Sequence, residues 1–403
     1  MTALFVAAGV RSFTVAMTGV LLGLYFAETG AGPATLGLVV GAGAAGSAAG
    51  TAALAWRPAW FRPRTTLIAV ALLSAAGLLT VSLGSGTALL TMAAFFGMVN
   101  GVGRDRGPAQ ALEQSLLADA APAHRRTAVF TQYALIQDAT GAVGALALGL
   151  PALLESAGGI PAAAGYRGTL AGGAGLLLLS AALYGRATGD AAAARAGLAP
   201  TATLSPRSRR RLTGLSGLFA LDSLGGGFLA GSIISYWFFQ RFGLGGDVLG
   251  PVFFGARVLN ATSYPVAAFL ARRIGLVRTM VFTHLPSSLV LLALPLVPGA
   301  ALAIGLFLVR EALVQMDVPT RQSYVAAVTL PGERTFAMAV TGLVRNVGWA
   351  FGPAAAGITM RLLGLGAPLV VGAVLKIGYD VALFAAYRSV PAPEENPRPR
   401  SYN

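Results

Sequence analysis

Long apolar stretches alternate with short polar turns along the whole of this 403-residue chain. An α-helix needs about 20 mostly apolar residues to cross a hydrocarbon core about 30 Å thick. The pattern therefore predicts twelve membrane-spanning helices, and the fourth of them is long for a single span. The predicted spans lie near 3–28, 34–56, 65–84, 88–118, 127–152, 167–186, 213–240, 246–270, 276–297, 299–328, 334–360 and 366–387.

An internal duplication divides these spans into two halves. Residues 113–144 align without a gap to 321–352, 208 positions later, with eight identities in 32 positions. A repeat of this length indicates a duplicated structural unit, and duplicated apolar halves are typical of two-bundle membrane transporters. The sequence predicts an N-terminal six-helix bundle over 1–186, a basic cytoplasmic linker over 187–211, a C-terminal six-helix bundle over 212–387 and a disordered cytoplasmic tail over 388–403.

Composition agrees with an all-α membrane protein and excludes several kinds of chemistry. Only 11% of residues are charged, against about 25% in a soluble globular domain. The absence of cysteine excludes disulfides and thiol chemistry. His124 and His284 are the only histidines and lie far apart in sequence, so no metal site is expected. No P-loop motif is present, so ATP drive is not supported and no cofactor is predicted.

The formal net charge of +14 raises the question of nucleic-acid binding, but the distribution of the charges argues against it. Eighteen arginines fall in one alternating set of loops and termini, as the positive-inside rule requires of a membrane protein. The bias predicts a multi-pass protein of the inner (plasma) membrane with both termini in the cytoplasm. The expected partners are membrane lipid, a small-molecule substrate and protons, with no nucleic acid.

Two local motifs carry a resemblance to a known family. The segment Leu270–Thr279, LARRIGLVRT, resembles the cytoplasmic turn G-x-x-x-D-R-x-G-R-R of the major facilitator superfamily, with Arg272 in place of the aspartate. Gly348-x-x-x-Gly352-Pro353-x-x-x-Gly357 resembles the Gly-Pro motif of antiporters in that superfamily, here on the eleventh span rather than the fifth. Together with the duplicated halves, the chain resembles a bacterial efflux-type member. The resemblance implies a monomeric carrier that works by alternating access, and it implies export only weakly.

Fifteen charged side chains are predicted at membrane depth, where insertion of one charge costs about 2.5–3.5 kcal/mol. The near-equal numbers of acids and bases indicate that most of them are structural pairs facing the bundle interior. The basic residues are Arg11, Arg104, Arg106, Arg257, Arg310, Arg321, Arg345 and Lys376, and the acids are Asp105, Glu113, Asp138, Asp222, Glu311, Asp317 and Asp380.

Position makes some of these residues candidates for substrate binding. The resemblance implies that the first, fourth, seventh and tenth spans line a central cavity. A mid-bilayer arginine on the eighth span also needs a partner or a polar ligand, and it has an asparagine almost one turn away. The substrate-site candidates are Arg11, Arg104, Asp105, Arg257, Asn260, Arg310 and Glu311.

Two acids are candidates for proton coupling. Asp222 is the only acid of the seventh span, and the alternative is that it pairs with a neighbour such as Arg257. Asp138 lies on the fifth span at nearly the depth of Arg345 on the eleventh. These opposite charges are interpreted either as a proton relay or as a lock between helices.

Gating is assigned to Glu113, Arg321 and Arg345. Glu113 and Arg321 occupy equivalent repeat positions with opposite charge, so we hypothesise an ion pair between the halves that favours the outward-facing state. The alternative is pairing closer in sequence: Asp317 with Arg321 at a spacing of i,i+4, and Arg106 near Glu113.

These patterns favour a secondary active transporter that exports a small organic solute, with proton coupling through a buried carboxylate. The first alternative is an uptake or facilitative carrier of a polar or anionic metabolite. A transport-dead sensor is another. An intramembrane enzyme is the remote alternative, because it would need a nucleophile with its base, or a metal cluster, and neither histidine supplies one. An enzymatic activity is therefore not predicted.

Overall fold

The computed structural model of the chain describes residues 1–57, 60–121, 125–186, 206–329 and 333–388, which are almost entirely helical and contain no strand. Eight helices in this described part are long and apolar enough to cross a membrane. The helices are α1 (Thr2–Glu28), α2 (Pro33–Trp56), α3 (Pro63–Leu83), α4 (Thr87–Gly97), α5 (Pro108–Ala120), α6 (Arg126–Leu146), α7 (Leu150–Gly158), α8 (Ala162–Arg186), α9 (Pro206–Gly227), α10 (Gly231–Phe242), α11 (Gly246–Ile274), α12 (Leu276–Ala293), α13 (Ala300–Val314), α14 (Asp317–Val328), α15 (Arg334–Leu363) and α16 (Ala367–Tyr387).

Each predicted span contains at least one of these helices. α9 begins at Pro206, inside the segment predicted to be a linker. Residues 187–205 of that linker and residues 389–403 of the predicted tail lie outside the described residues, as does His124. The predicted all-α class is confirmed.

The fourth predicted span is not one helix, and the prediction of a continuous helix over 88–118 is wrong. α4 ends at Gly97, and the backbone then turns through left-handed Met98 (φ 50°) and Gly103 (φ 84°) before α5 begins at Pro108. Asn100 holds the turn, because its Oδ1 accepts the N–H groups of Val102 and Gly103 at 2.9 and 3.0 Å. Glycine permits the positive φ, and proline suits the first turn of a new helix.

The seventh and tenth predicted spans are interrupted as well. Residues 228–230 separate α9 from α10, and residues 315–316 separate α13 from α14. The break before α10 is hydrogen-bonded to the break after α4: the Gly231 N–H donates to the Val102 carbonyl at 3.3 Å, and the Ser232 N–H donates to the Gly101 carbonyl at 3.2 Å. Non-helical backbone at membrane depth is tolerated only where protein or a water-filled cavity surrounds it.

The chain forms two compact units. The N-terminal unit comprises Met1–Gly197, Gly226–Arg257 and Trp349–Pro368, and the C-terminal unit comprises Leu198–Gly225, Val258–Gly348 and Leu369–Asn403. The units divide between residues 197 and 198, inside the segment predicted to be the linker, and also within α9, α11, α15 and α16.

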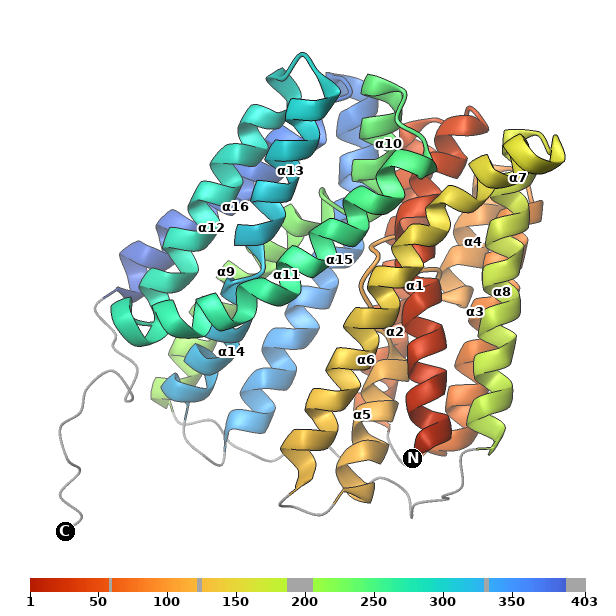
Figure 1. Cartoon of the computed structure of the whole chain (residues 1–403). Helices are drawn as coiled ribbons and strands as arrows, with labels where there is room; N and C mark the ends of the chain where they lie inside the picture. Colours follow the sequence, from red (N-terminus) through yellow and green to blue (C-terminus); the bar gives the residue numbers. More distant parts are fainter. Residues whose placement is uncertain (58–59, 122–124, 187–205, 330–332, 389–403) are drawn as a thin grey trace, which may run out of the picture. The chain divides into compact units, whose positions relative to one another are not determined.

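In the N-terminal unit, α1 is the central helix. It packs against α6, α8 and α10, and α3 packs along α8 (Figure 1). The core of this unit includes Leu67 and Ala71 of α3 with Leu117, Tyr133 and Tyr184. α1 is consequently buried over most of its length, including its polar residues Arg11, Ser12, Thr14 and Thr18.

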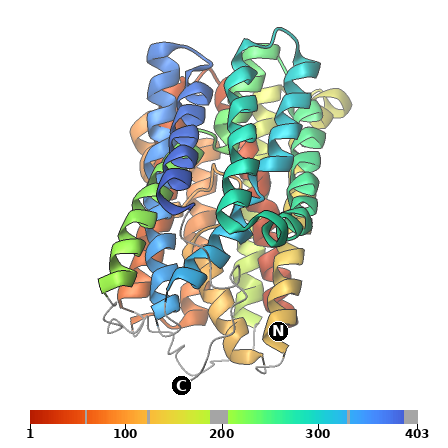
Figure 2. The ribbon, with the colours of Figure 1, turned by 90° about the vertical axis from the view of Figure 1, so that its left-hand side faces the viewer.

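In the C-terminal unit, α12 packs against α13 and α14, and α12 and α13 lie side by side in both views of the ribbon (Figure 1, Figure 2). Its core includes Phe219, Met280, Tyr324, Tyr379 and Leu383. Burial of these aromatic and aliphatic side chains fixes the relative positions of the helices that carry the charged residues of this unit.

Close contact between α3 and α4 depends on two glycines, which yields a first prediction. A Cβ at Gly77 would lie 2.6 Å from the Gly97 Cα, whereas a Cβ at Gly175, on the exposed face of α8, would meet nothing within 4 Å. Gly77→Val should therefore destabilise the protein by about 1–3 kcal/mol through overpacking. Thermal unfolding in detergent should show a lower midpoint for Gly77→Val than for the control Gly175→Val, and equal midpoints would contradict the packing described.

Candidate functional site

A buried ionic centre lies around Arg11 of α1 in the N-terminal unit. Arg11 is 5% exposed and Glu113 of α5 is fully buried. The Arg11 Nη2 lies 2.5 Å from Glu113 Oε2, and its Nε donates to Glu113 Oε1 at 3.3 Å. Nη1 forms a second ion pair with Asp105, on the segment between α4 and α5. One guanidinium therefore joins a carboxylate of the helix break itself to a carboxylate of the helix that follows the break.

Two tyrosines complete the surroundings of Glu113. The Tyr133 hydroxyl donates to Oε2 at 2.6 Å, and the Tyr184 hydroxyl donates to Oε1. Gln137 then donates to the Tyr133 hydroxyl at 3.2 Å. With two donors from Arg11 and two from the tyrosines, the carboxylate of Glu113 is fully hydrogen-bonded. We call Arg11, Asp105, Glu113, Tyr133 and Tyr184 the Arg11 centre.

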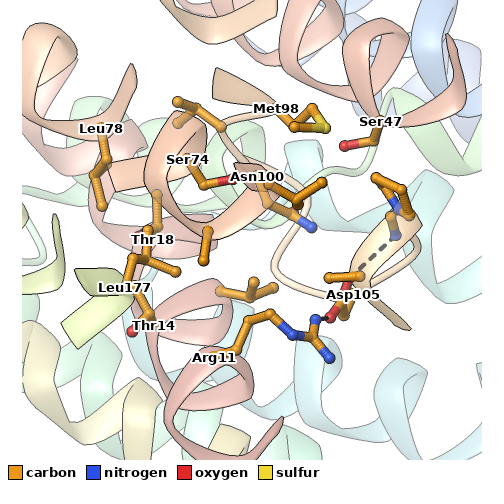
Figure 3. Close-up of a pocket in the computed structure, with 17 residues that line it drawn as sticks. Arg11, Thr14, Thr18, Ser47, Ser74, Leu78, Met98, Asn100, Asp105 and Leu177 are labelled. Carbon is orange, nitrogen blue, oxygen red and sulfur yellow. Dashed lines mark hydrogen bonds and ion pairs between the residues drawn. The ribbon is translucent and has the colours of Figure 1, made fainter. Parts of the chain in front are cut away.

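A cavity of about 60 Å³ lies beside the Arg11 centre, and the segment between α4 and α5 forms part of its wall (Figure 3). Arg11 and Asp105 lie together on one side of it (Figure 3). A buried water needs at least about 10–15 Å³, so the cavity has room for a few waters or a small polar group of a ligand. Its lining combines these two charges with polar and apolar side chains, among them Thr14, Thr18, Ser47, Ser74, Leu78, Met98 and Leu177.

The wall of the cavity carries one hydroxyl that the described protein atoms leave unused. Thr18 is 3% exposed, and its Oγ1 has no hydrogen-bond partner among the described residues. Asp105 Oδ1 accepts the Gly107 N–H at 3.1 Å, and Oδ2 is the oxygen that pairs with Arg11 Nη1. Because Arg11 also neutralises Glu113, the centre holds two carboxylates for one guanidinium and has an excess of negative charge.

A second buried ionic centre lies around Asp222 of α9 in the C-terminal unit. Asp222 is 4% exposed. Its Oδ1 accepts a hydrogen bond from Lys376 Nζ at 2.8 Å, and its Oδ2 lies 3.2 Å from Arg321 Nη1 and 3.6 Å from Arg345 Nη1. Arg321 also pairs with Asp317 one turn earlier in α14, at 2.5 Å. Three cations from α14, α15 and α16 thus surround this one carboxylate.

His284 of α12 extends this centre toward a further acid. Its Nδ1 lies 2.9 Å from both carboxylate oxygens of Asp380, and its Nε2 lies 3.3 Å from Lys376 Nζ. His284 is 1% exposed and Asp380 is fully buried. The residues of the Asp222 centre are Asp222, His284, Asp317, Arg321, Arg345, Lys376 and Asp380.

The two centres occupy equivalent places in the duplication with their charges reversed. Glu113 and Arg321 are 208 positions apart, as are Gln137 and Arg345, and all four belong to these networks. In the first repeat a cation on the first span binds an acid on the fourth. In the second repeat an acid on the seventh span binds a cation on the tenth. The repeat thus conserves the place of the ion pair while exchanging the signs of its partners.

Other predicted site residues lie apart from these contacts. Asn260 Nδ2 donates to Glu311 Oε2 at 3.0 Å, and Arg310 pairs with Glu311, all within the C-terminal unit. In the N-terminal unit, Arg257 donates to the Gly103 carbonyl. Arg104 is half-buried in the segment between α4 and α5.

The structure decides between several interpretations of the charges. Asp222 is paired, but with Lys376, Arg321 and Arg345 rather than with the suggested neighbour Arg257. The i,i+4 pair of Asp317 with Arg321 is confirmed. Glu113 binds Arg11 rather than the suggested Arg106, whose guanidinium lies 4.4 Å from the ring centroid of Trp349.

The remaining gating and proton-coupling assignments stay predictions. Glu113 and Arg321 each form ion pairs within their own unit. These pairs do not test the predicted ion pair of Glu113 with Arg321 between the halves. Asp138 of α6 is half-buried, and no described residue forms an ion pair or hydrogen bond with its side chain.

Sequence reasoning missed His284 as a functional residue. It counted Lys376 and Asp380 among the charges at membrane depth without assigning them to a site. One signal was present, because Lys376 and Asp380 are four residues apart and therefore share a helix face. A single histidine in an apolar helix, by contrast, gives no pattern to detect.

Comparisons with known proteins agree with this architecture. No protein-family model matches the chain. The chain is 24% identical over 420 residues to the "Uncharacterized membrane protein YJR124C" of Saccharomyces cerevisiae, covering 95% of this chain and 92% of that protein.

Among solved structures, a bacterial homologue of the human lysosomal transporter Spinster, in an inward-facing and occupied conformation, aligns with a TM-score of 0.74 at 15% identity, over 96% of each chain. The D-xylose–proton symporter aligns with a TM-score of 0.70 at 16% identity, over 98% of this chain and 99% of the symporter. The chain therefore has the fold of the major facilitator transporters, as the sequence predicts. It is a multi-pass membrane protein with an all-helical transporter fold.

The Arg11 centre yields a second prediction. Removal of one partner from a buried ion pair costs about 3–5 kcal/mol, because it leaves the other charge buried and unpaired. Arg11→Met should therefore strongly lower the unfolding temperature in detergent, and Glu113→Gln in the same chain should restore part of the loss. Arg167→Met, at an exposed arginine of α8, is the matched control and should change stability little. An additive effect of the two substitutions at the centre would contradict their coupling.

Proposed function

We propose that this protein is a secondary transporter that moves a small organic solute across the membrane by alternating access, coupled to protons. The observation that carries the proposal is the partly open cavity beside Arg11 and Asp105, with the broken fourth span in its wall. Support comes from the fold, which the chain shares with a lysosomal-type transporter homologue and a sugar–proton symporter.

The broken span is the physical argument for a ligand site. Discontinuous helices in transporter folds place backbone and polar groups at the middle of the membrane, where substrates and coupling ions bind. Charged groups at that depth are costly and commonly mark a transport pathway. Arg11 and Asp105 meet both conditions, because one lies on the central helix of its unit and the other on the break itself.

The charge balance at the cavity favours a solute with a cationic group, such as a protonated amine. Two carboxylates share one guanidinium there, and Thr18 Oγ1 has no hydrogen-bond partner among the described residues. An ammonium group has only donors to offer, so it would complement the excess of carboxylate and the Thr18 oxygen. We propose Asp105 as the residue that binds this group and Thr18 as its hydrogen-bonding neighbour.

Proton coupling is assigned to the Asp222 centre, with Asp138 as the second candidate. Asp222 is joined to every other charged group of its centre directly or through one neighbour, so a change of proton occupancy there alters contacts among α9, α12, α14, α15 and α16.

Direction is proposed as export on the basis of the Gly352-Pro353 motif, which packs closely on Gly227 beside the break of the seventh span. The arginine distribution supports cytoplasmic termini in an inner membrane, and the proposed working form is a monomer.

A ligand panel and a flux assay test this proposal and give a third prediction. Purified protein would be heated with size-matched organic cations, neutral polyols and organic anions, because a ligand of the folded state raises the melting temperature by mass action. A cationic hit should then exchange as a labelled solute in counterflow across proteoliposomes. If no compound in the panel that binds undergoes counterflow, the transport proposal fails.

The matched pair Asp105→Asn and Asp247→Asn tests the binding residue. Asp105 lies at the cavity with 10% of its side chain exposed, whereas Asp247 is exposed at the start of α11. The two substitutions therefore make the same chemical change inside the proposed site and outside it. Asp105→Asn should weaken binding of the cation at least about tenfold, since an uncharged amide replaces a buried carboxylate, equivalent to about 1.4 kcal/mol. An unchanged affinity in Asp105→Asn would reject the cationic site.

A further inference from the structure

We propose that Lys376 and His284 share one exchangeable proton, and that this pair is the place where the C-terminal unit binds and releases the coupling proton. The sharing itself follows from the geometry of the Asp222 centre. Its role in coupling rests on the proposed transport function.

The pair lies between two aspartates in a nearly dry environment. Lys376 Nζ is 2.8 Å from Asp222 Oδ1 on one side and 3.3 Å from His284 Nε2 on the other. His284 Nδ1 is 2.9 Å from both oxygens of Asp380. Exposure is 5% for Lys376, 1% for His284, 4% for Asp222 and 0% for Asp380. The order of groups is therefore carboxylate, amine, imidazole, carboxylate.

Hydrogen-bonding chemistry fixes which atom carries which hydrogen. An ionised carboxylate only accepts, so His284 Nδ1, which faces two carboxylate oxygens, carries a hydrogen and donates. In neutral imidazole the other ring nitrogen is then an acceptor. The Lys376 ammonium has only donors, and it donates to His284 Nε2 as well as to Asp222. This arrangement satisfies all four groups with one proton on the amine and none on Nε2.

A second proton on the pair would be unfavourable. If Nε2 were also protonated, its N–H would face the ammonium across 3.3 Å, with two positive charges adjacent in a buried site. The charge count agrees with single occupancy. Asp222, Asp317 and Asp380 supply three negative charges, and Arg321, Arg345 and one proton on the pair supply three positive charges.

The proton can move within the pair without changing that balance. An N–H bond of Lys376 breaks and leaves its electron pair on Nζ, while a new N–H bond forms at His284 Nε2. The product is a neutral amine beside Asp222, which keeps Arg321 and Arg345, and an imidazolium beside Asp380. Asp222 keeps cationic partners before and after the step, whereas Asp380 faces a neutral imidazole before the step and an imidazolium after it.

No other group facing the pair offers an equivalent proton. α14 contributes Arg321 with its partner Asp317, and α15 contributes Arg345; arginine does not deprotonate in proteins. α16 also contributes Tyr379, whose ring packs edge-on against His284 with centroids 5.8 Å apart. Asp222 is bound by three cations, which favours its ionised form. Both oxygens of Asp380 lie 2.9 Å from His284 Nδ1, as in a carboxylate that accepts one N–H, so we take Asp380 as ionised. Among the charged groups that the structure describes around this centre, the exchangeable proton then falls to the amine and the imidazole.

The composition of the chain makes this pair directly observable, and the fourth prediction uses it. Lys376 is the only lysine, and His284 is one of two histidines. Nitrogen-15 labelling of lysine and histidine in the full-length chain, in nanodiscs and with His124→Gln, therefore gives one side-chain amine and one imidazole to follow by NMR. Between about pH 5 and pH 9, the Lys376 Nζ and His284 Nε2 signals should titrate together while Nδ1 stays protonated.

Two substitutions provide the controls. Lys376→Arg keeps the charge and the ion pair with Asp222 but cannot release a proton, so His284 should lose the shared titration while the protein stays folded. His284→Gln removes the imidazole from the pair, so the Lys376 Nζ signal should lose the component that it shares with Nε2. If the amine and the imidazole of the unsubstituted pair each hold a fixed protonation state over this range, or titrate independently, the proposal is overturned.

Flux measurements separate this inference from the proposed function. In Lys376→Arg, counterflow of the labelled solute should persist, whereas accumulation driven by a proton gradient should be lost. A pair that titrates as expected in a chain without solute flux would reject transport and leave the proton site standing. Proton-driven accumulation that survives in Lys376→Arg would reject the coupling role.

Discussion

The cost of placing a charge in a membrane governs the arrangement of this protein. A buried charge is stable only when an opposite charge and enough hydrogen bonds accompany it. Arg11 and Asp222 each lie on the first span of a repeat, and each is bound from the fourth span of the same repeat. The ion pair therefore joins helices that are distant in sequence, and tyrosine or histidine side chains from further helices complete it.

The reversal of signs between the repeats gives the two centres different chemistry. The Arg11 centre has one cation for two acids and lies on a cavity, so it suits a positively charged ligand. In the Asp222 centre three cations surround one acid, and a histidine adjoins the lysine, so it suits the storage of a proton. The two repeats thus present similar frameworks, and equivalent positions such as 113 and 321 carry opposite charges in them.

Much of the fold was predictable because hydropathy and the duplication are properties of long windows. The twelve apolar stretches correspond to helices, and the repeat directed attention to Glu113 and Arg321. The break in the fourth span was not predicted, since an apolar window contains no information on backbone direction, although Gly101, Gly103 and Pro108 mark the place. The partners of the charges were also beyond the sequence. A list of buried acids and bases does not show that Asp222 meets Lys376 on the last helix, or that His284 bridges Lys376 to Asp380.

The hydrogen bonds between the two helix breaks have a consequence for genetics. The amides of Gly231 and Ser232 bind the carbonyls of Val102 and Gly101, so main chain recognises main chain. Ordinary side-chain replacement leaves every one of these atoms in place. Proline alone removes an amide hydrogen. A scan that replaces residues with alanine would therefore report crowding at this junction, because a Cβ at Gly101 would lie 2.5 Å from Val40 and a Cβ at Gly231 would lie 2.8 Å from the Gly19 carbonyl oxygen. The hydrogen bonds themselves would be tested by a proline scan.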